Sequence, residues 1–219
     1  MSVRLAIFDC DGTLVDSQHS IVAAMRGAFE AASLTCPPRA DILSIVGLSL
    51  PHAMARLLPD ADADLHDSMV AHYKTCFFDM RASGGLREPL YDGVTDLLDA
   101  LTAQDWLLAI ATGKSDRGLA AVLAHHGLSD RFVSLQTADR HPSKPHPSMI
   151  ETALAETGAQ REHAVMIGDT SFDMLMAQAA EVAALGVGWG YHAPDELIAA
   201  GARSVAMDSV ELARHIGLP

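Results

Sequence analysis

The chain has 219 residues, 49% of them hydrophobic, and its 28 Asp and Glu against 15 Lys and Arg give a formal net charge of −13. This length suits one large domain or one core with an insertion. The acidic balance argues against nucleic acid or an anionic membrane as a partner, because both require a basic surface. A small anionic substrate stays possible, since a bound cation and a few lysines reverse the local field.

The cysteines and the apolar runs bear on the cellular compartment of the protein. Cys10, Cys36 and Cys76 have no motif spacing, which is typical of reduced thiols in a cytoplasmic protein. The N-terminal residues lack the pattern of a signal peptide, and no apolar run reaches the ~20 residues of a membrane span. We therefore expect a cytoplasmic protein, and its oligomeric state stays open.

The first part of the chain is predicted to be a strand followed by helices. Residues 3–8 are short and apolar and end at an Asp/Gly cluster, which indicates a buried strand. Residues 17–33 have the apolar spacing of a helix, with Ser17 as its N-cap. Residues 36–87 are predicted to be mostly helical with breaks at prolines and glycines, and residues 81–94 to contain a loop.

The second part of the chain alternates between helices and strands. Helices are predicted at 92–103, 115–126, 147–157, 171–180 and from 209, and strands at 106–112, 131–137, 164–170, 182–187 and 203–206. This alternation predicts an α/β fold with a parallel sheet, and the nearly continuous apolar strands indicate a sheet covered on both faces. The helical block interrupts the alternation and is interpreted as an inserted second domain.

Polar side chains follow three of the predicted strands. Asp9 and Asp11 come after the first strand, and Thr112 ends the second. Asp169 lies at the end of the strand at 164–170, and Asp173 follows it. Because the carboxyl ends of parallel strands meet at one edge of a sheet, we expect these residues to form one site.

Asp9 and Asp11 place two carboxylates one residue apart, and Gly12 gives the chain the freedom to turn after them. Neighbouring carboxylates tend to separate their pKa values, so that one stays ionised while the other holds a proton. A nucleophile paired with a general acid needs this arrangement. The dipeptide Asp-Gly alone would favour a simple turn with an N-cap aspartate, whereas the whole segment "FDCDGTL" favours a site.

Four segments together resemble the motifs of the haloacid dehalogenase-like superfamily of phosphohydrolases. "FDCDGTLVDS" resembles the first motif, D-x-D-G-T, and "AIATGK", "SKPHP" and "VMIGDTSFD" resemble the other three in order. The resemblance implies a Rossmann-like core formed by residues 1–15 and 88–219. It also implies an α-helical cap formed by residues 16–87, as in phosphoglycolate phosphatase-like and β-phosphoglucomutase-like members.

A carboxylate that attacks a phosphoryl group is repelled by its charge and needs a cation between the two. A site with only oxygen ligands suits Mg²⁺, and Asp9 and Asp169 are the natural carboxylate ligands. The resemblance implies that the backbone carbonyl of Asp11 is a third ligand. It also implies that Asp173 lies beyond the ligands and holds a metal-bound water or Lys144.

The remaining candidate residues are expected to bind the phosphoryl group or to take part in its transfer. Thr112 offers a hydroxyl and Gly113 a backbone N–H just before a helix, whose N-terminus favours anions. Lys144 offsets the negative charge of the reacting groups. Asp11 is expected to protonate the leaving oxygen and then to deprotonate the attacking water. Lys114 either contacts the substrate or has no functional role.

These residues predict a Mg²⁺-dependent phosphatase that acts on a small phosphorylated metabolite through an aspartyl-phosphate at Asp9. Asp11 separates the chain from dehalogenases, which lack this second aspartate. Phosphoglycolate is the first expected substrate, from the resemblance, and inorganic pyrophosphate the next. The alternatives are a β-phosphoglucomutase-like phosphotransferase and a non-catalytic binding module. Arg26, Arg56 and Lys74 of the insertion either contact a substrate anion or are surface charges.

Overall fold

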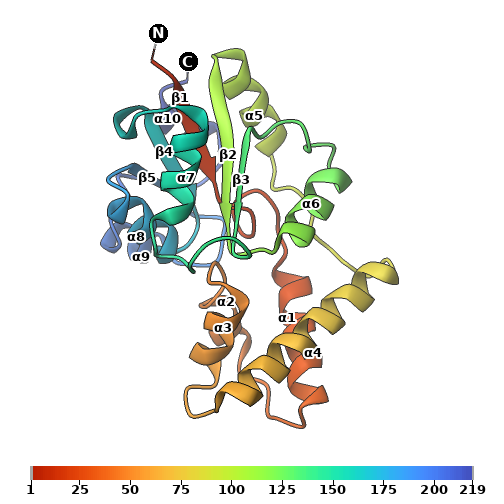
Figure 1. The fold of residues 1–219 in the computed structure, drawn as a ribbon. Coiled ribbons are helices and arrows are strands. Elements are labelled where there is room, and N and C mark those ends of the chain that lie inside the picture. Colours follow the sequence, from red (N-terminus) through yellow and green to blue (C-terminus); the bar gives the residue numbers. More distant parts are fainter. Residues whose placement is uncertain (1, 219) are drawn as a thin grey trace.

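A computed structural model describes residues 2–218 and contains a six-stranded sheet in the order β3-β2-β1-β4-β5-β6, with every pair of neighbours parallel. This confirms the predicted α/β fold with a parallel sheet (Figure 1). The strands are β1 (Arg4–Phe8), β2 (Trp106–Thr112), β3 (Ser134–Thr137), β4 (Ala164–Gly168), β5 (Ala183–Val187) and β6 (Val205–Ala206).

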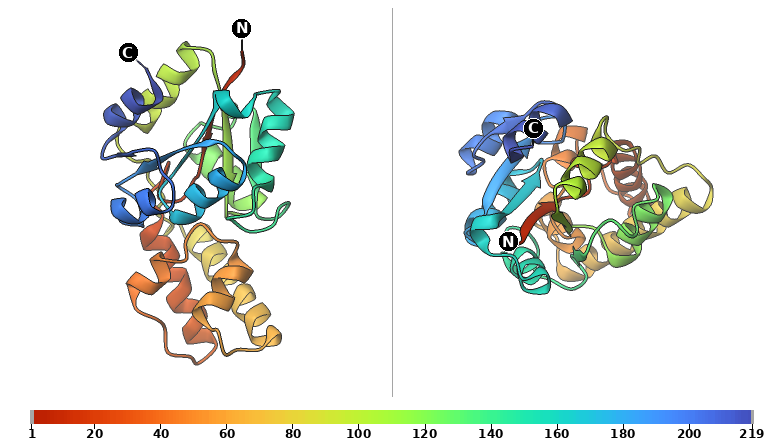
Figure 2. Two further views of the ribbon diagram at one scale, coloured as in Figure 1. Left: turned by 90° about the vertical axis from the view of Figure 1, so that its left-hand side faces the viewer. Right: turned by 90° about the horizontal axis from the view of Figure 1, so that it is seen from above.

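Helices cover both faces of the sheet, and the side chains of β1 alternate between the two. Ala6 and Phe8 pack into one apolar cluster, whereas Leu5 and Ile7 pack into the other. The first face is covered by α5 (Val94–Ala103), α6 (Asp116–His125) and α10 (Ser209–Ile216), and the second by α7 (Ser148–Thr157), α8 (Ser171–Ala179) and α9 (Pro194–Ala199). Figure 2 shows α5 and α10 together on their side of the sheet. Both faces of the central strands are therefore buried.

A helical insertion, here called the cap, lies between β1 and β2 and beyond the carboxyl ends of the strands (Figure 1). It comprises α1 (Gln18–Ala31), α2 (Arg39–Leu43), α3 (Leu50–Leu57) and α4 (Ala63–Ala82). The cap has an apolar cluster of its own, separate from the two clusters on the faces of the sheet, with Met25, Phe29 and Met54 among its buried members. The domain boundaries at residues 16 and 87 stay a prediction.

The two segments that join the cap to the core run side by side. Val15 and Leu90 form an antiparallel bridge, and the N–H of Asp16 donates to the carbonyl of Pro89 at 2.8 Å. The N–H of Tyr91 donates to the carbonyl of Leu14 at 3.0 Å. The chain therefore enters and leaves the cap at one place.

Some elements differ from the prediction. β3 begins at Ser134 and not at residue 131, and the side chain of Val133 before it is 57% exposed. Helix α9 was not predicted, although Pro194 at its first turn and the acidic residues that follow are ordinary helix-start signals. No helix among residues 2–218 is both long and apolar enough to cross a membrane.

Candidate active site

The strand order reverses between β1 and β4, which makes this the topological switch point where α/β sheets form their sites. Asp9 directly follows β1, and its N–H donates to the carbonyl of Ile167 in β4 at 2.9 Å. Asp169 directly follows β4. The sheet register therefore brings these two aspartates to adjacent positions at the edge that faces the cap.

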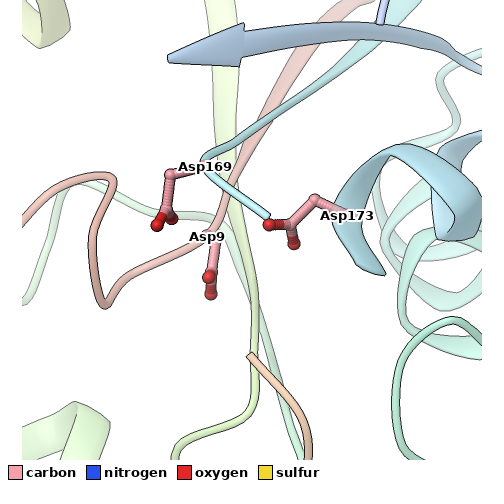
Figure 3. A group of neighbouring side chains, drawn as sticks. All are labelled: Asp9, Asp169 and Asp173. Carbon is pink, nitrogen blue, oxygen red and sulfur yellow. The ribbon is translucent and has the colours of Figure 1, made fainter. Parts of the chain in front are cut away.

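Asp9, Asp169 and Asp173, here called the carboxylate cluster, are all buried and converge in space (Figure 3). One carboxylate oxygen from each lies within 4.8 Å of the others. Asp173 joins the cluster because it lies in the first turn of α8, the helix that begins just after β4.

Lys144 supplies the positive charge closest to the carboxylate cluster. Its Nζ is fully buried and lies 2.9 Å from Oδ1 of Asp9 and 2.6 Å from Oδ1 of Asp173. Burial lowers the pKa of Lys144, but the attraction of Asp173 and Asp9 is larger, so that the net pKa is raised and the ammonium stays charged. One ammonium faces three carboxylates, which leaves an excess of negative charge.

Asp169 is held by partners on both sides. Its Oδ1 accepts a hydrogen bond from Oγ1 of Thr13 at 2.8 Å, and its Oδ2 accepts one from the N–H of Tyr191 at 2.9 Å. Gly12 and Gly190 pack so closely on this carboxylate that a Cβ at either would lie 2.1 to 2.2 Å from an Asp169 atom. Gly12 also has a φ of +86°, which favours glycine.

Both oxygens of Asp173 are already occupied. Oδ1 accepts the hydrogen bond from Lys144, and Oδ2 accepts hydrogen bonds from the N–H and the Oγ1 of Thr170 in a capping box at the start of α8. Asp173 is therefore placed to orient Lys144 rather than to give an oxygen to an ion.

The side chain of Asp11 turns away from the carboxylate cluster. Its Oδ1 lies 2.9 Å from Nζ of Lys114 and accepts a hydrogen bond from Oγ of Ser17, which in turn lies 3.2 Å from the hydroxyl of Tyr191. Lys114 also lies 2.7 Å from Oε1 of Glu88. Ser17 occupies the N-cap position of α1, but its side chain makes no capping hydrogen bond because it is used by Asp11.

Thr112 and Gly113 lie where the cap touches the core. Thr112 is buried at the end of β2, and its Oγ1 accepts a hydrogen bond from the N–H of Lys114 at 3.2 Å. A Cβ at Gly113 would lie 2.7 Å from the carbonyl oxygen of Leu48, so only glycine fits here. The N–H of Ser49 also donates to Oγ of Ser143 in the core at 2.8 Å, so the cap loop closes directly over the site.

Burial dominates the electrostatics of the carboxylates. It raises the pKa of Asp9 from 3.8 to about 7, with Asp173 and Asp11 adding to the rise and Lys144 opposing it. Burial and the charges of Asp9 and Asp173 raise the pKa of Asp169 well above its ordinary value. A bound cation would therefore stabilise the ionised form of both carboxylates.

The donor set fits a hard divalent cation. Oδ2 of Asp9 is buried and has no hydrogen-bond partner among residues 2–218, although a buried carboxylate oxygen normally has one. Asp9 and Asp169 offer only oxygen, and the surplus negative charge and the raised pKa values are the signs of a site built for a positive ion.

The fold thus collects Asp9, Lys144, Asp169 and Asp173 at one point, with Thr112, Gly113, Asp11 and Lys114 around it. Sequence reasoning did not identify Glu88, Thr13 or Tyr191, which hold Lys114 and Asp169. Of the cap cations, Lys74 lines the cavity at the site, Arg56 lies over the ring of Phe172, and Arg26 lines a separate surface hollow.

Comparison with known proteins agrees with this geometry. The family model of haloacid dehalogenase-like hydrolases matches residues 6–187. The chain is 37% identical to "Probable phosphatase IndB" of Dickeya dadantii, over 90% of this chain and 86% of that protein. It is 31% identical to phosphoglycolate phosphatase of Agrobacterium fabrum, over 85% and 81% of the two chains.

A solved structure agrees as well. The structure of a haloacid dehalogenase-like family hydrolase from Streptococcus pneumoniae superposes with a TM-score of 0.84 at 25% identity, and covers 97% of this chain and 98% of its own. The chain therefore belongs to the haloacid dehalogenase-like hydrolases and is a phosphatase of that family.

Proposed function

We propose that the protein is a Mg²⁺-dependent phosphatase that hydrolyses a small phosphate monoester through an aspartyl-phosphate at Asp9. The observation that carries this proposal is the unpartnered Oδ2 of Asp9 beside Asp169 and Lys144. The two oxygens of Asp9 can divide the work, so that one would contact a cation while the other attacks the phosphorus atom. Asp9 and Asp169 would hold Mg²⁺, which supplies neutralisation of the nucleophile and of the phosphoryl oxygens when bound.

The other residues have roles that follow from their contacts. The carboxylate of Asp9 forms a bond to phosphorus while the bond to the leaving oxygen breaks, and Asp11 gives that oxygen a proton. Both contacts of Asp11 use Oδ1, which leaves Oδ2 to transfer the proton. Asp11 then takes a proton from the water that releases phosphate from Asp9.

Thr112 and Gly113 are proposed to bind the transferred phosphoryl group. They stand before α6, whose N-terminus favours an anion. Lys144 stabilises charge at the reacting oxygens, and Asp173 keeps Lys144 in place. Lys114 is proposed to orient Asp11, because two carboxylates already occupy its ammonium.

The test is release of inorganic phosphate from a panel that includes phosphoglycolate, pyrophosphate, sugar phosphates and simple alkyl phosphates. Wild type should release phosphate with Mg²⁺ and not with EDTA. Asp9→Asn should be inactive, whereas Asp79→Asn, an exposed aspartate on α4, should match wild type. Activity in Asp9→Asn would contradict the nucleophile. Transfer only in the presence of an acceptor sugar would favour a phosphotransferase.

A further inference from the structure

The cavity between the cap and the core is large for a two-carbon leaving group. Its volume is about 470 Å³, and Asp9, Asp11 and Thr112 lie at its core side. Cavities of roughly 300–1,000 Å³ usually bind ligands of drug size. A glycolate moiety would leave most of this space to be filled by water against apolar walls.

The cap side of the cavity is apolar and aromatic. Its lining includes Ile21, Met25, Val46, Leu48, Tyr73 and Phe77. The rings of Tyr73 and Phe77, one turn apart on α4, stack with centroids 5.8 Å apart and an interplanar angle of 28°. This pair, here called the aromatic wall, gives the cap side of the cavity an aromatic surface against which another ring can pack.

The aromatic wall begins next to the residue proposed to protonate the leaving group. Nζ of Lys114 lies 2.9 Å from Asp11 and 5.6 Å from the centroid of the Phe77 ring. Asp11, Lys114 and Phe77 therefore line the same part of the cavity.

The same cavity offers little to a carboxylate on the leaving group. Lys114 is occupied by Asp11 and Glu88. Arg81 lies 3.4 Å from Glu88, with its Cζ 5.7 Å from the centroid of the Phe77 ring. Lys74 and Arg117 line the cavity but are exposed. A carboxylate against the aromatic wall would lose its water and would have to compete with Glu88 for Arg81 or Lys114, which is costly.

We propose that the natural substrate is a phosphate monoester of an alcohol that carries an aromatic ring, with the ring packed against Tyr73 and Phe77. This inference rests on the proposed phosphatase function and names its substrate class. The reaction is unchanged: the ester oxygen leaves with a proton from Asp11, and the ring-bearing alcohol is the product.

The first experiment compares kcat/KM for 2-phenylethyl phosphate, ethyl phosphate and phosphoglycolate, whose leaving groups are all alkoxides. The ring ester should exceed ethyl phosphate by at least about tenfold, which corresponds to about 1.4 kcal/mol. Phe77→Ala should lower kcat/KM for the ring ester by a larger factor than for ethyl phosphate, and Phe77→Leu should keep part of the advantage. Thr75→Ala, on the exposed side of the same helix, is the matched control.

Three results would overturn the inference: equal use of ethyl phosphate and the ring ester, a preference for phosphoglycolate or pyrophosphate, or an equal loss for all esters in Phe77→Ala. Lys74→Ala and Arg117→Ala test the anionic alternative, because a loss confined to phosphoglycolate would show that these cations bind a carboxylate.

A binding measurement separates this inference from the proposed function. Calorimetry with Mg²⁺ compares 3-phenylpropylphosphonate, propylphosphonate and 3-phosphonopropionate, which cannot be hydrolysed at an ester bond. Selective binding of the phenyl compound that is lost in Phe77→Ala, without phosphate release from any ester, would support the ring site and contradict the phosphatase. Phosphate release without any preference for the ring-bearing compounds would support the phosphatase and contradict the ring site.

Discussion

Replacing Asp9 by Asn should stabilise the protein when no metal is present. The pKa of Asp9 rises from 3.8 to about 7 in the folded chain, chiefly because the carboxylate is buried. The folded state therefore keeps a proton that the unfolded chain releases, and the stability that goes with this proton is complete below pH 3.8 and is lost as the pH rises to about 7.

The size of the effect follows from the same shift. One pKa unit corresponds to about 1.4 kcal/mol, so the raised pKa of Asp9 lowers the free energy of unfolding, relative to an uncharged side chain, by about 4 kcal/mol at pH 8 and by about 2 kcal/mol at pH 5. Asn has nearly the same shape and no charge, and Lys144 keeps Asp173 as a partner. Asp9→Asn should thus be more stable than wild type, and the gain should be larger at pH 8.

Urea denaturation of both proteins in EDTA at pH 5 and pH 8 measures this difference in stability. A second series with Mg²⁺ measures how much the ion stabilises each protein. Mg²⁺ should stabilise wild type more than Asp9→Asn, since an ion that binds only the folded state raises its stability. A variant that is less stable than wild type at pH 8 in EDTA would refute the reasoning. So would a gain that does not change between the two pH values.

Further predictions concern the metal ligands. Thr13→Val removes the hydroxyl that orients Asp169 and should weaken Mg²⁺ binding by about tenfold or more, as measured by calorimetry. Gly190→Ala places a methyl group 2.2 Å from Cβ of Asp169 and should also reduce Mg²⁺ affinity, because the carboxylate must move. In wild type, a proton competes with Mg²⁺ for Asp9, so Mg²⁺ affinity should fall by about tenfold for each pH unit below about 7.

Matched variants control these measurements. Thr75→Val makes the same change on the exposed surface of α4, and Gly85→Ala adds a methyl group whose nearest neighbour lies 3.6 Å away. Both should bind Mg²⁺ as wild type does. Wild-type affinity in Thr13→Val or Gly190→Ala would show that Asp169 does not hold the ion, and a Mg²⁺ affinity independent of pH would contradict proton competition at Asp9.

The sequence allowed the parallel sheet to be predicted because strand ends are marked locally. Asp9, Thr112 and Asp169 each follow an apolar run, and the rule that parallel strands end at one edge was enough to bring them together. The contacts that orient these residues come from distant parts of the chain. Thr13 bonds Asp169 across 156 positions, and Glu88 reaches Lys114 across 26.

Some local sequence patterns, such as an N-cap position or the spacing of a helix face, are compatible with more than one structural role. Ser17 has the position of an N-cap, yet its hydroxyl donates to Asp11 and makes no capping hydrogen bond. The lining of the cavity could likewise not be predicted from the sequence. Tyr73 and Phe77 have the spacing of an ordinary helix face, and only the packing of α4 over the core turns that face toward Asp11.

The paired linkers at Val15 and Leu90 make the cap an exchangeable module. Because the chain leaves and re-enters the core at one place, a different helical unit of any length could be joined there without altering the register of the sheet. The separate apolar cluster of the cap strengthens this independence, since it shares no buried member with the clusters of the core. New leaving-group specificities can therefore arise by replacing cap residues, provided that Ser17 and Glu88, which hold Asp11 and Lys114, are kept.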